Sequence, residues 1–319
     1  MKHRVTLALL FALAMAFSFA TRLQAQVPVT DDEVKVTTYK RFVDNREPNP
    51  AAAYQAAKDY MVRYGKEDDQ YTRYLKVWIS AFEKDERQDS LLRSIYGEKN
   101  YAAGFGLAKQ VLTDDPEDIK ALIALGYGGY LSTINAKNET FNADSLRYAQ
   151  KAIQLIDSGR APDTWAPFKG KDDAVASLNY AIGFYWLRPR AEEAIGHLIK
   201  AAQSNSDRKT APTTYYYLAL AYQNGPYHRL SDDYQKRFST QAESPESKAA
   251  LDNINKVVDK IIDAYARAVA LAGNDPQNQK ARDGWMVTLT NFYKFRHDKT
   301  DAGLTEFIAG VLAKPLPQP

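Results

Sequence analysis

Apolar residues recur at intervals of three and four along most of this 319-residue chain. This spacing places them on one face of an α-helix, whereas the strict alternation that is typical of a half-buried strand is nearly absent. The same segments are rich in Ala, Leu, Lys and Glu, which favour helices. The pattern predicts helices over residues 51–64, 71–84, 101–112, 145–156, 191–202 and 253–272. The expected fold class is therefore all-α.

Acidic pairs stand where several of these helices should begin. Asp114-Asp115 comes shortly before the helical pattern that starts at Ile119, and Asp172-Asp173 comes before the next such pattern. Carboxylates at these positions cap the first turn and interact favourably with the positive end of the helix dipole. Paired carboxylates also serve acid–base and metal chemistry, but capping explains their positions without a further function.

Helices of this length, joined in pairs, indicate a repeat, because one pair alone cannot bury its apolar face. The first helix of each pair follows the large-small-large order W-x2-L-G-x2-Y, which lets neighbouring helices dock closely. The matching positions are Leu122, Leu125-Gly126 and Gly129; Leu178, Ala181-Ile182 and Tyr185; Tyr215, Leu218-Ala219 and Tyr222; and Trp285, Thr288-Leu289 and Phe292. In the first of these sets the last aromatic residue is missing, because Gly129 stands in its place. Second helices match at Ala53-x3-Ala57, Gly104-x3-Ala108, Ser145-x3-Ala149, Ala194-x3-Leu198, Ile261-x3-Tyr265 and Gly303-x3-Phe307.

These motifs resemble the tetratricopeptide-repeat family over residues 34–313. The resemblance implies an α-solenoid of antiparallel helix pairs, which we call TPR-like. The second-helix motifs from Gly104 onward lie 41, 49, 67 and 42 residues apart, against 34 in the regular repeat. Linkers at residues 134–142, 158–171 and 224–247 absorb the excess, so we expect an arc with expanded linkers. Loops held on a rigid scaffold often carry binding residues.

The first residues have the three-part pattern of a secretory signal peptide. Basic residues precede an apolar run over residues 5–20, and Leu23-Gln24-Ala25 forms the cleavage site, with cleavage after Ala20 as the alternative. The apolar run is shorter than the roughly 20 residues that a spanning helix needs. We predict a signal peptide at 1–25, a flexible segment at 26–33, the helical-repeat domain at 34–313 and a proline-rich tail at 314–319. The expected location is periplasmic or secreted.

The chain contains no cysteine, which excludes a lipid-modified N-terminus, disulfides, thiol chemistry and cysteine-ligated metal. Without Lys2, Arg4 and Arg22, the 42 basic residues fall to 39, which equals the number of acidic residues. A mature chain without net charge has no overall field for nucleic acid or for an anionic membrane. We therefore expect neither as a partner.

Motifs for chemistry are sparse. None of His197, His228 and His297 has another histidine or a cysteine at metal-ligand spacing. The glycines of "GYGGY" (126–130) lack the G-x-G-x-x-G order of a dinucleotide-binding site. We predict no cofactor, no metal and no enzymatic activity. The less favoured alternative is an enzyme whose site uses carboxylates of the longest linker, such as Asp232, Asp233 or Glu243.

Tyrosine is abundant, with 21 residues, and its side chain packs with its ring and hydrogen-bonds with its hydroxyl. The resemblance implies that certain first-helix positions line a concave face. Those positions are Lys120, Ile123, Tyr127, Tyr130, Asn179, Trp186, Tyr216, Leu220, Gln223, Met286, Thr290 and Tyr293. Within "TTYYYLALAYQN" (213–224), Tyr215 and Tyr222 fall on the core stripe and Tyr216 on the binding face. The alternative is that most of the set packs beneath the linkers.

The function that these features favour is non-catalytic binding of another envelope protein, or of an extended peptide, through the concave tyrosine-rich face. Rigid aromatic anchors provide contact area in such grooves at low entropy cost. A carbohydrate or small-ligand binding protein is the first alternative, because Tyr and Trp rings also stack on sugars.

Overall fold

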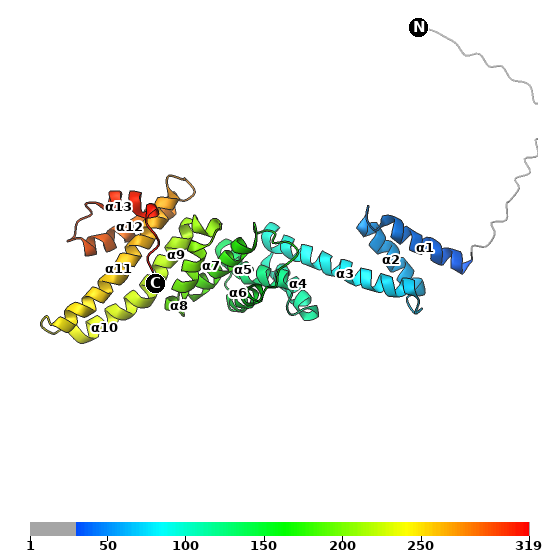
Figure 1. Ribbon diagram of the computed structural model, residues 1–319, viewed down its shortest axis with the longest axis horizontal. Helices are drawn as coiled ribbons and strands as arrows, with labels where there is room; N and C mark the ends of the chain where they lie inside the picture. The colour runs from blue at the N-terminus through cyan, green and yellow to red at the C-terminus, as the bar shows by residue number, and fades with distance from the viewer. Residues whose placement is uncertain (1–29, 319) are drawn as a thin grey trace, which may run out of the picture. The chain divides into compact units, whose positions relative to one another are not determined.

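The computed structural model describes residues 30–318, and in this part of the chain every regular element is a helix (Figure 1). The α-helices are α1 (Asp31–Asn45), α2 (Pro50–Tyr64), α3 (Gln70–Leu92), α4 (Tyr101–Asp114), α5 (Ile119–Ala136), α6 (Asn142–Asp157), α7 (Lys171–Trp186), α8 (Ala191–Gln203), α9 (Pro212–Tyr222), α10 (His228–Phe238), α11 (Pro245–Ala272), α12 (Gln279–Arg296) and α13 (Leu304–Gly310). Short π-helical turns cover Arg93–Gly97 and Gln223–Tyr227, and 3-10 turns cover Asp207–Lys209 and Val311–Ala313. The all-α prediction is confirmed, and each predicted helical stretch lies within a helix.

Side-chain caps explain where several helices start. Thr30 and Glu33 form a capping box at α1, in which each side chain accepts the backbone N–H of the other residue. Because α1 begins at Asp31, the predicted domain boundary at residue 34 falls inside this helix. Asp118 caps α5 by accepting the backbone N–H three residues later at 3.0 Å, and an acidic pair occupies the first turn of α7.

The chain forms two compact units, and the division after Phe82 falls within α3. In the first unit α1 packs against α2. Its core consists of Phe42, Ala53, Ala56, Ala57, Tyr60, Tyr64 and Leu75. The ring of Trp78 packs edge-on against Phe42, with 4.9 Å between the centroids. This unit therefore has an apolar core of its own.

In the second unit, helices pack in neighbouring pairs (Figure 1): α5 with α6, α7 with α8, α9 with α11, and α11 with α12. Contacts of α6 with α7 and of α8 with α9 connect successive pairs. One large cluster of buried residues extends from α5 to the turn after α13, and a smaller one joins the end of α3, α4 and α5. Burial of these clusters holds the pairs together.

Two glycines allow α5 and α6 to approach closely. A Cβ atom on Gly126 would lie 2.7 Å from the Cα atom of Ala149, and one on Gly129 would lie 2.3 Å from Oγ of Ser145. The repeat motif expects a small residue at Gly126, whereas at Gly129 it expects an aromatic side chain. Ser145 and Ala149 are completely buried, so the close packing expected at Gly126 is confirmed, and the contact at Gly129 adds to it.

The prediction of a linker over residues 224–247 is wrong over residues 224–238, which contain the end of a π-helical turn and α10, and from Pro245, where α11 begins. Tyr227, Leu230 and Tyr234 lie partly buried against the large cluster, and their spacing places them on one helix face. Pro226 hides this pattern in the sequence, because proline ordinarily ends a helix. In the structure Pro226 lies inside the π-helical turn Gln223–Tyr227, and α10 follows directly. The linker predicted at 158–171 is non-helical up to Gly170, as expected. The linker predicted at 134–142 is non-helical only over residues 137–141, because α5 extends to Ala136 and α6 begins at Asn142.

Among residues 30–318, no helix combines the length and the apolar character needed to cross a membrane. The predicted signal peptide lies outside the described residues.

Candidate functional site

The residues predicted to line a concave face fall into two groups by burial. The buried group consists of Ile123, Tyr127, Tyr130, Asn179, Trp186 and Tyr293. The partly buried group consists of Lys120, Tyr216, Leu220, Gln223, Met286 and Thr290. Solvent therefore reaches mainly the second group.

Several polar side chains of this set are already bonded within the chain. The amide oxygen of Asn179 lies 2.8 Å from Nδ1 of His197. The amide oxygen of Gln223 accepts a hydrogen bond from the Tyr265 hydroxyl at 2.7 Å. The hydroxyl of Thr290 donates to a carbonyl of its own helix at 2.8 Å. These groups position helices and leave little capacity for a ligand.

Tyr127 and Tyr130 of α5 belong to an aromatic cluster that reaches α7 and α9. The rings of Tyr130 and Tyr180 meet edge-on with 5.1 Å between centroids, and their hydroxyl oxygens are 3.0 Å apart. Tyr180 in turn donates to the hydroxyl of Thr213 at 3.0 Å. The cluster thus connects helices from three successive pairs.

Arg208, from the 3-10 turn between α8 and α9, completes this cluster. Its Nη2 donates to the Tyr127 hydroxyl, and its Nε donates to Oγ of Ser177 at 3.3 Å. The guanidinium carbon lies 4.4 Å from the ring centroid of Tyr180 and 5.4 Å from that of Tyr127, within the range of cation–π attraction. We call Tyr127, Tyr130, Tyr180 and Arg208 the tyrosine–arginine cluster.

Arg208 is partly buried, and within the described part of the chain no carboxylate forms an ion pair with it. Charged side chains that leave water are ordinarily paired. Hydrogen bonds within the described residues engage Nε and Nη2 only, so Nη1 has no protein acceptor there. The cluster therefore contains a positive charge with hydrogen-bonding capacity to spare.

The segment between α6 and α7 covers part of the cluster. Phe168 contacts the ring of Tyr127 edge-on, with 5.8 Å between centroids, and contacts Tyr96 in the same way at 6.1 Å. Trp165 also packs against the large cluster of buried residues. A linker thus lies over part of the predicted face, which supports the alternative that some of its residues pack beneath linkers.

Tyr216 is partly buried, whereas Tyr215 and Tyr222 are 6% and 3% exposed. The prediction that Tyr215 and Tyr222 are core residues is confirmed. The Tyr216 ring stacks on Trp285 with 5.1 Å between centroids and contacts Tyr217 at 5.4 Å. Packing holds Tyr216 in place while part of the ring remains accessible.

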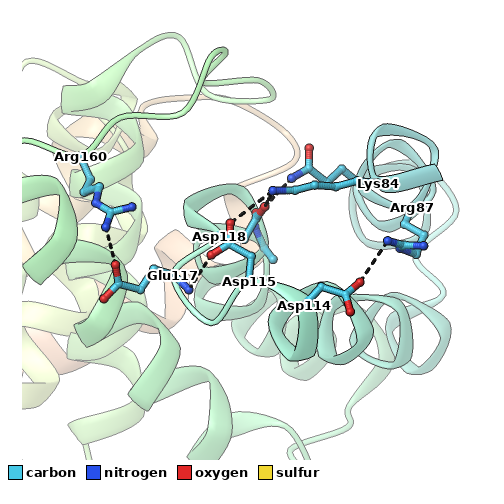
Figure 2. A network of polar contacts seen from close by, with 9 residues as sticks. Lys84, Arg87, Asp114, Asp115, Glu117, Asp118 and Arg160 are labelled. Carbon is cyan, nitrogen blue, oxygen red and sulfur yellow. Dashed lines mark hydrogen bonds and ion pairs between the residues drawn. The ribbon is translucent and has the colours of Figure 1, made fainter. Parts of the chain in front are cut away.

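Lys120 lies apart from the tyrosines, and its Nζ is 2.6 Å from a carboxylate oxygen of Asp163. Figure 2 shows the neighbouring charges, where Lys84 of α3 reaches Asp115 at 3.2 Å and Asp118 at 3.3 Å. Other pairs in this network are Arg87 with Asp114 at 3.1 Å and Arg160 with Glu117 at 2.5 Å. Because each of these cations lies within ion-pair distance of a carboxylate, the network fastens α3 and the segment after α6 to the turn between α4 and α5.

Burial shifts the titration of the inner side chains away from neutral pH. It raises the pKa of Tyr127 and Tyr130, and it raises that of Tyr180 well above its usual value. Burial also lowers the pKa of His197 from 6.5 to about 4, and the charge of Lys200 acts in the same direction. At pH 7 the tyrosines are therefore hydrogen-bond donors and the imidazole is neutral.

The carboxylates considered for an enzymatic site lie at the surface in separate ion pairs. Asp233 pairs with Arg237 at 3.1 Å, and Glu243 pairs with Lys248 at the same distance. Asp232 lies 3.5 Å from a ring nitrogen of His228. No group of three or more His, Cys, Asp or Glu residues between positions 30 and 318 is arranged to hold a metal ion.

A groove of about 600 Å³ in the first unit was not expected from the sequence. Its apolar lining includes Val36, Tyr39, Val43 and Tyr71, and Val36 is 67% exposed. The spacing of Val36, Tyr39 and Val43 on one face of α1 is the signal that could have revealed it. Exposed apolar surfaces of this kind are often covered by other proteins.

Arg208 was also missed. It stands in the polar segment "QSNSDRKT" (203–210), where its neighbour Lys209 is equally basic. The local pattern does not distinguish the two residues. Only the position of the turn beside Tyr127 and Tyr180 gives Arg208 its role.

Comparison with protein-family models, with curated proteins and with solved structures found no match to this chain.

Proposed function

We propose that this protein is a non-catalytic scaffold of the cell envelope that binds another protein or an extended peptide through a TPR-like array of helix pairs. The observation that carries the proposal is Arg208, a partly buried charge among tyrosines with an unused donor. The pairing of neighbouring helices and the close contacts at Gly126 and Gly129 support the TPR-like arrangement.

The chemistry of the cluster favours a ligand that presents oxygen atoms. A guanidinium donates hydrogen bonds in a fixed plane and matches carboxylate or carbonyl oxygens. The tyrosine rings around Arg208 add rigid contact area. An extended segment with an acidic side chain would accept from Nη1 and add a second favourable charge to that of Asp173, which already acts on the partly buried guanidinium.

A binding role agrees with the protonation of the inner residues. The pKa values of Tyr127, Tyr130 and Tyr180 are raised by burial, and the pKa of His197 is lowered to about 4. General acid–base catalysis works best when a pKa lies near the operating pH. These side chains are poorly suited to it and well suited to fixed hydrogen bonds.

The test is crosslinking in cells that export the protein, followed by mass spectrometry of the captured proteins. Arg208→Met keeps the length and packing of the side chain but removes its charge and donors. We expect one specific partner to be recovered about tenfold less, since hydrogen bonds to a charged group contribute roughly 1.5–3 kcal/mol. Tyr216→Ala should lower recovery of the same partner if the binding face extends to α9.

Arg229→Met is the matched control, because Arg229 pairs with Glu192 at the surface, 2.7 Å away, and lies outside the cluster. Its recovery of the partner should equal that of the wild type. Failure to capture a specific protein, or equal recovery with Arg208→Met, would contradict the proposal.

A direct binding measurement with soluble glycans distinguishes a carbohydrate ligand from a protein partner. The stacking of Tyr216 on Trp285 occupies ring faces that a sugar would need. If the wild type binds a glycan and Arg208→Met does not, the ligand of this site is a sugar and not a protein.

A further inference from the structure

A buried ion pair lies on α11 and shares no residue with the tyrosine–arginine cluster. Nε of Arg267 is 2.6 Å from one carboxylate oxygen of Asp263, and Nη2 is 3.3 Å from the other. The two side chains are 5% and 11% exposed. A carboxylate uses only part of the hydrogen-bonding capacity of a guanidinium, so Arg267 needs further acceptors.

The described part of the proline-rich tail, residues 314–318, supplies these acceptors. Nη2 of Arg267 donates to the backbone carbonyl of Lys314 at 3.0 Å and to that of Pro315 at 2.9 Å. Carbonyl oxygens belong to the main chain of any peptide. Arg267 therefore holds a peptide backbone, with no requirement for the side chains at these two positions.

The shape of the tail suits this contact. Lys314 has extended backbone angles, φ −91° and ψ 148°, close to those of a polyproline II helix. Leu316 packs against the large cluster of buried residues and is partly buried, as is Pro317. Nζ of Lys314 lies 5.2 Å from the ring centroid of Phe307. Two main-chain hydrogen bonds and one leucine anchor thus hold an extended segment.

We propose that Asp263, Arg267 and the apolar surface under Leu316 form a binding site for an extended, proline-containing segment of a partner protein, with a leucine after the proline. Residues 314–318 occupy this site when no partner is bound. Prolyl segments suit such sites because their extended shape is formed before binding and little entropy is lost. Lys314, Pro315 and Gln318 are exposed, so the tail is held by few contacts and exchange with a partner is feasible. This inference does not rest on the role proposed for Arg208.

The test uses the full chain with Leu316→Asp, which removes the anchor and frees the site. A fluorescent peptide of residues 312–318, "LAKPLPQ", is the probe, and its binding is followed by fluorescence anisotropy. We expect at least about tenfold tighter binding to Leu316→Asp than to the wild type, because the attached tail competes at a high effective concentration. The same peptide with aspartate in place of Leu316 should not bind.

Arg267 is tested by adding Arg267→Met and Asp263→Leu to the Leu316→Asp chain. Replacing both charges by apolar groups avoids an unpaired buried charge, and thermal unfolding followed by circular dichroism verifies the fold. We expect binding of the peptide to weaken at least about tenfold, since two hydrogen bonds to a charged donor are lost. Arg296→Met is the control in the same chain, because Arg296 pairs with Asp259, also on α11, without touching the tail.

Equal binding of the peptide to the wild type and to Leu316→Asp, or no binding to either, would overturn the proposal. So would unchanged binding after the substitutions at Arg267 and Asp263. A concentration-dependent dimer of the wild type that Leu316→Asp abolishes would overturn it in favour of tail exchange between two copies of this chain.

Discussion

At the scale of single residues, unusual chemistry in this protein arises where a charged or polar side chain leaves water among aromatic rings. Arg208 lies between Tyr127 and Tyr180 without an ion-pair partner among the described residues. Arg267, in contrast, has a carboxylate and two carbonyls as acceptors. The first arginine keeps a donor without an acceptor among the described residues, on which the proposed binding role rests, and the second is satisfied by the chain itself.

His197 leads to a prediction about pH. Its folded-state pKa of about 4 is below the ordinary value of 6.5, mainly because of burial beside Trp186. As the pH falls below 6.5, His197 binds a proton in the unfolded chain but not in the folded chain. Its contribution to the free energy of unfolding is therefore fully present above pH 6.5 and is lost as the pH falls towards 4. Partial solvent exposure of the ring reduces the expected loss to about 1–2 kcal/mol.

Urea unfolding of the wild type and of His197→Gln at pH 7 and pH 5 measures this loss. The substitution should flatten the pH dependence within this window, although other groups still contribute. If both proteins lose the same free energy of unfolding between the two pH values, the histidine is not responsible.

At the scale of secondary structure elements, small residues decide how closely paired helices pack. Gly126 and Ala149 bring α5 against α6, and the completely buried Ala194 and Leu198 of α8 pack against α7. The polar network in Figure 2 acts at the same scale, because Lys84 connects α3 to the N-terminal cap of α5, Asp118. Close packing and capped turns together fix each pair.

Gly126→Ala tests the close contact of α5 and α6. The added Cβ would lie 2.7 Å from a backbone atom of Ala149, so one helix must shift. We expect a loss of about 1–3 kcal/mol in the free energy of unfolding, as for other overpacked cores. Gly196→Ala on α8 is the control: nothing lies within 4 Å of its Cβ, and alanine should stabilise the helix by about 0.5–1 kcal/mol. Chemical denaturation of both variants gives the comparison, and a Gly126→Ala protein as stable as the wild type would contradict the packing argument.

At the scale of the whole molecule, the chain contains two compact units with separate clusters of buried residues. Phe42 is completely buried in the first unit, and Leu218 is 1% exposed in the second. Regions with separate cores can open independently, and hydrogen exchange detects such openings residue by residue.

Phe42→Ala and Leu218→Ala test this independence. Removal of a large buried side chain costs roughly 2–5 kcal/mol. We expect Phe42→Ala to accelerate amide exchange among described residues up to Phe82, and Leu218→Ala to accelerate it within the second unit. Each variant serves as the control for the other. Acceleration spread evenly over both units after either substitution would show a single cooperative unit.

Local periodicity determined the helices, the close contact at Gly126, and the core positions of Tyr215 and Tyr222, because neighbours three or four residues apart always share a helix face. Only the tertiary structure decided which predicted face residues are buried, that α10 interrupts the longest linker, and where Arg208 and Arg267 lie. Arg208 and Tyr127 are 81 residues apart in sequence, and Arg267 meets carbonyls 47 and 48 residues away. Such contacts depend on how whole helices pack, and the side chains that make them leave no periodic signal in the sequence.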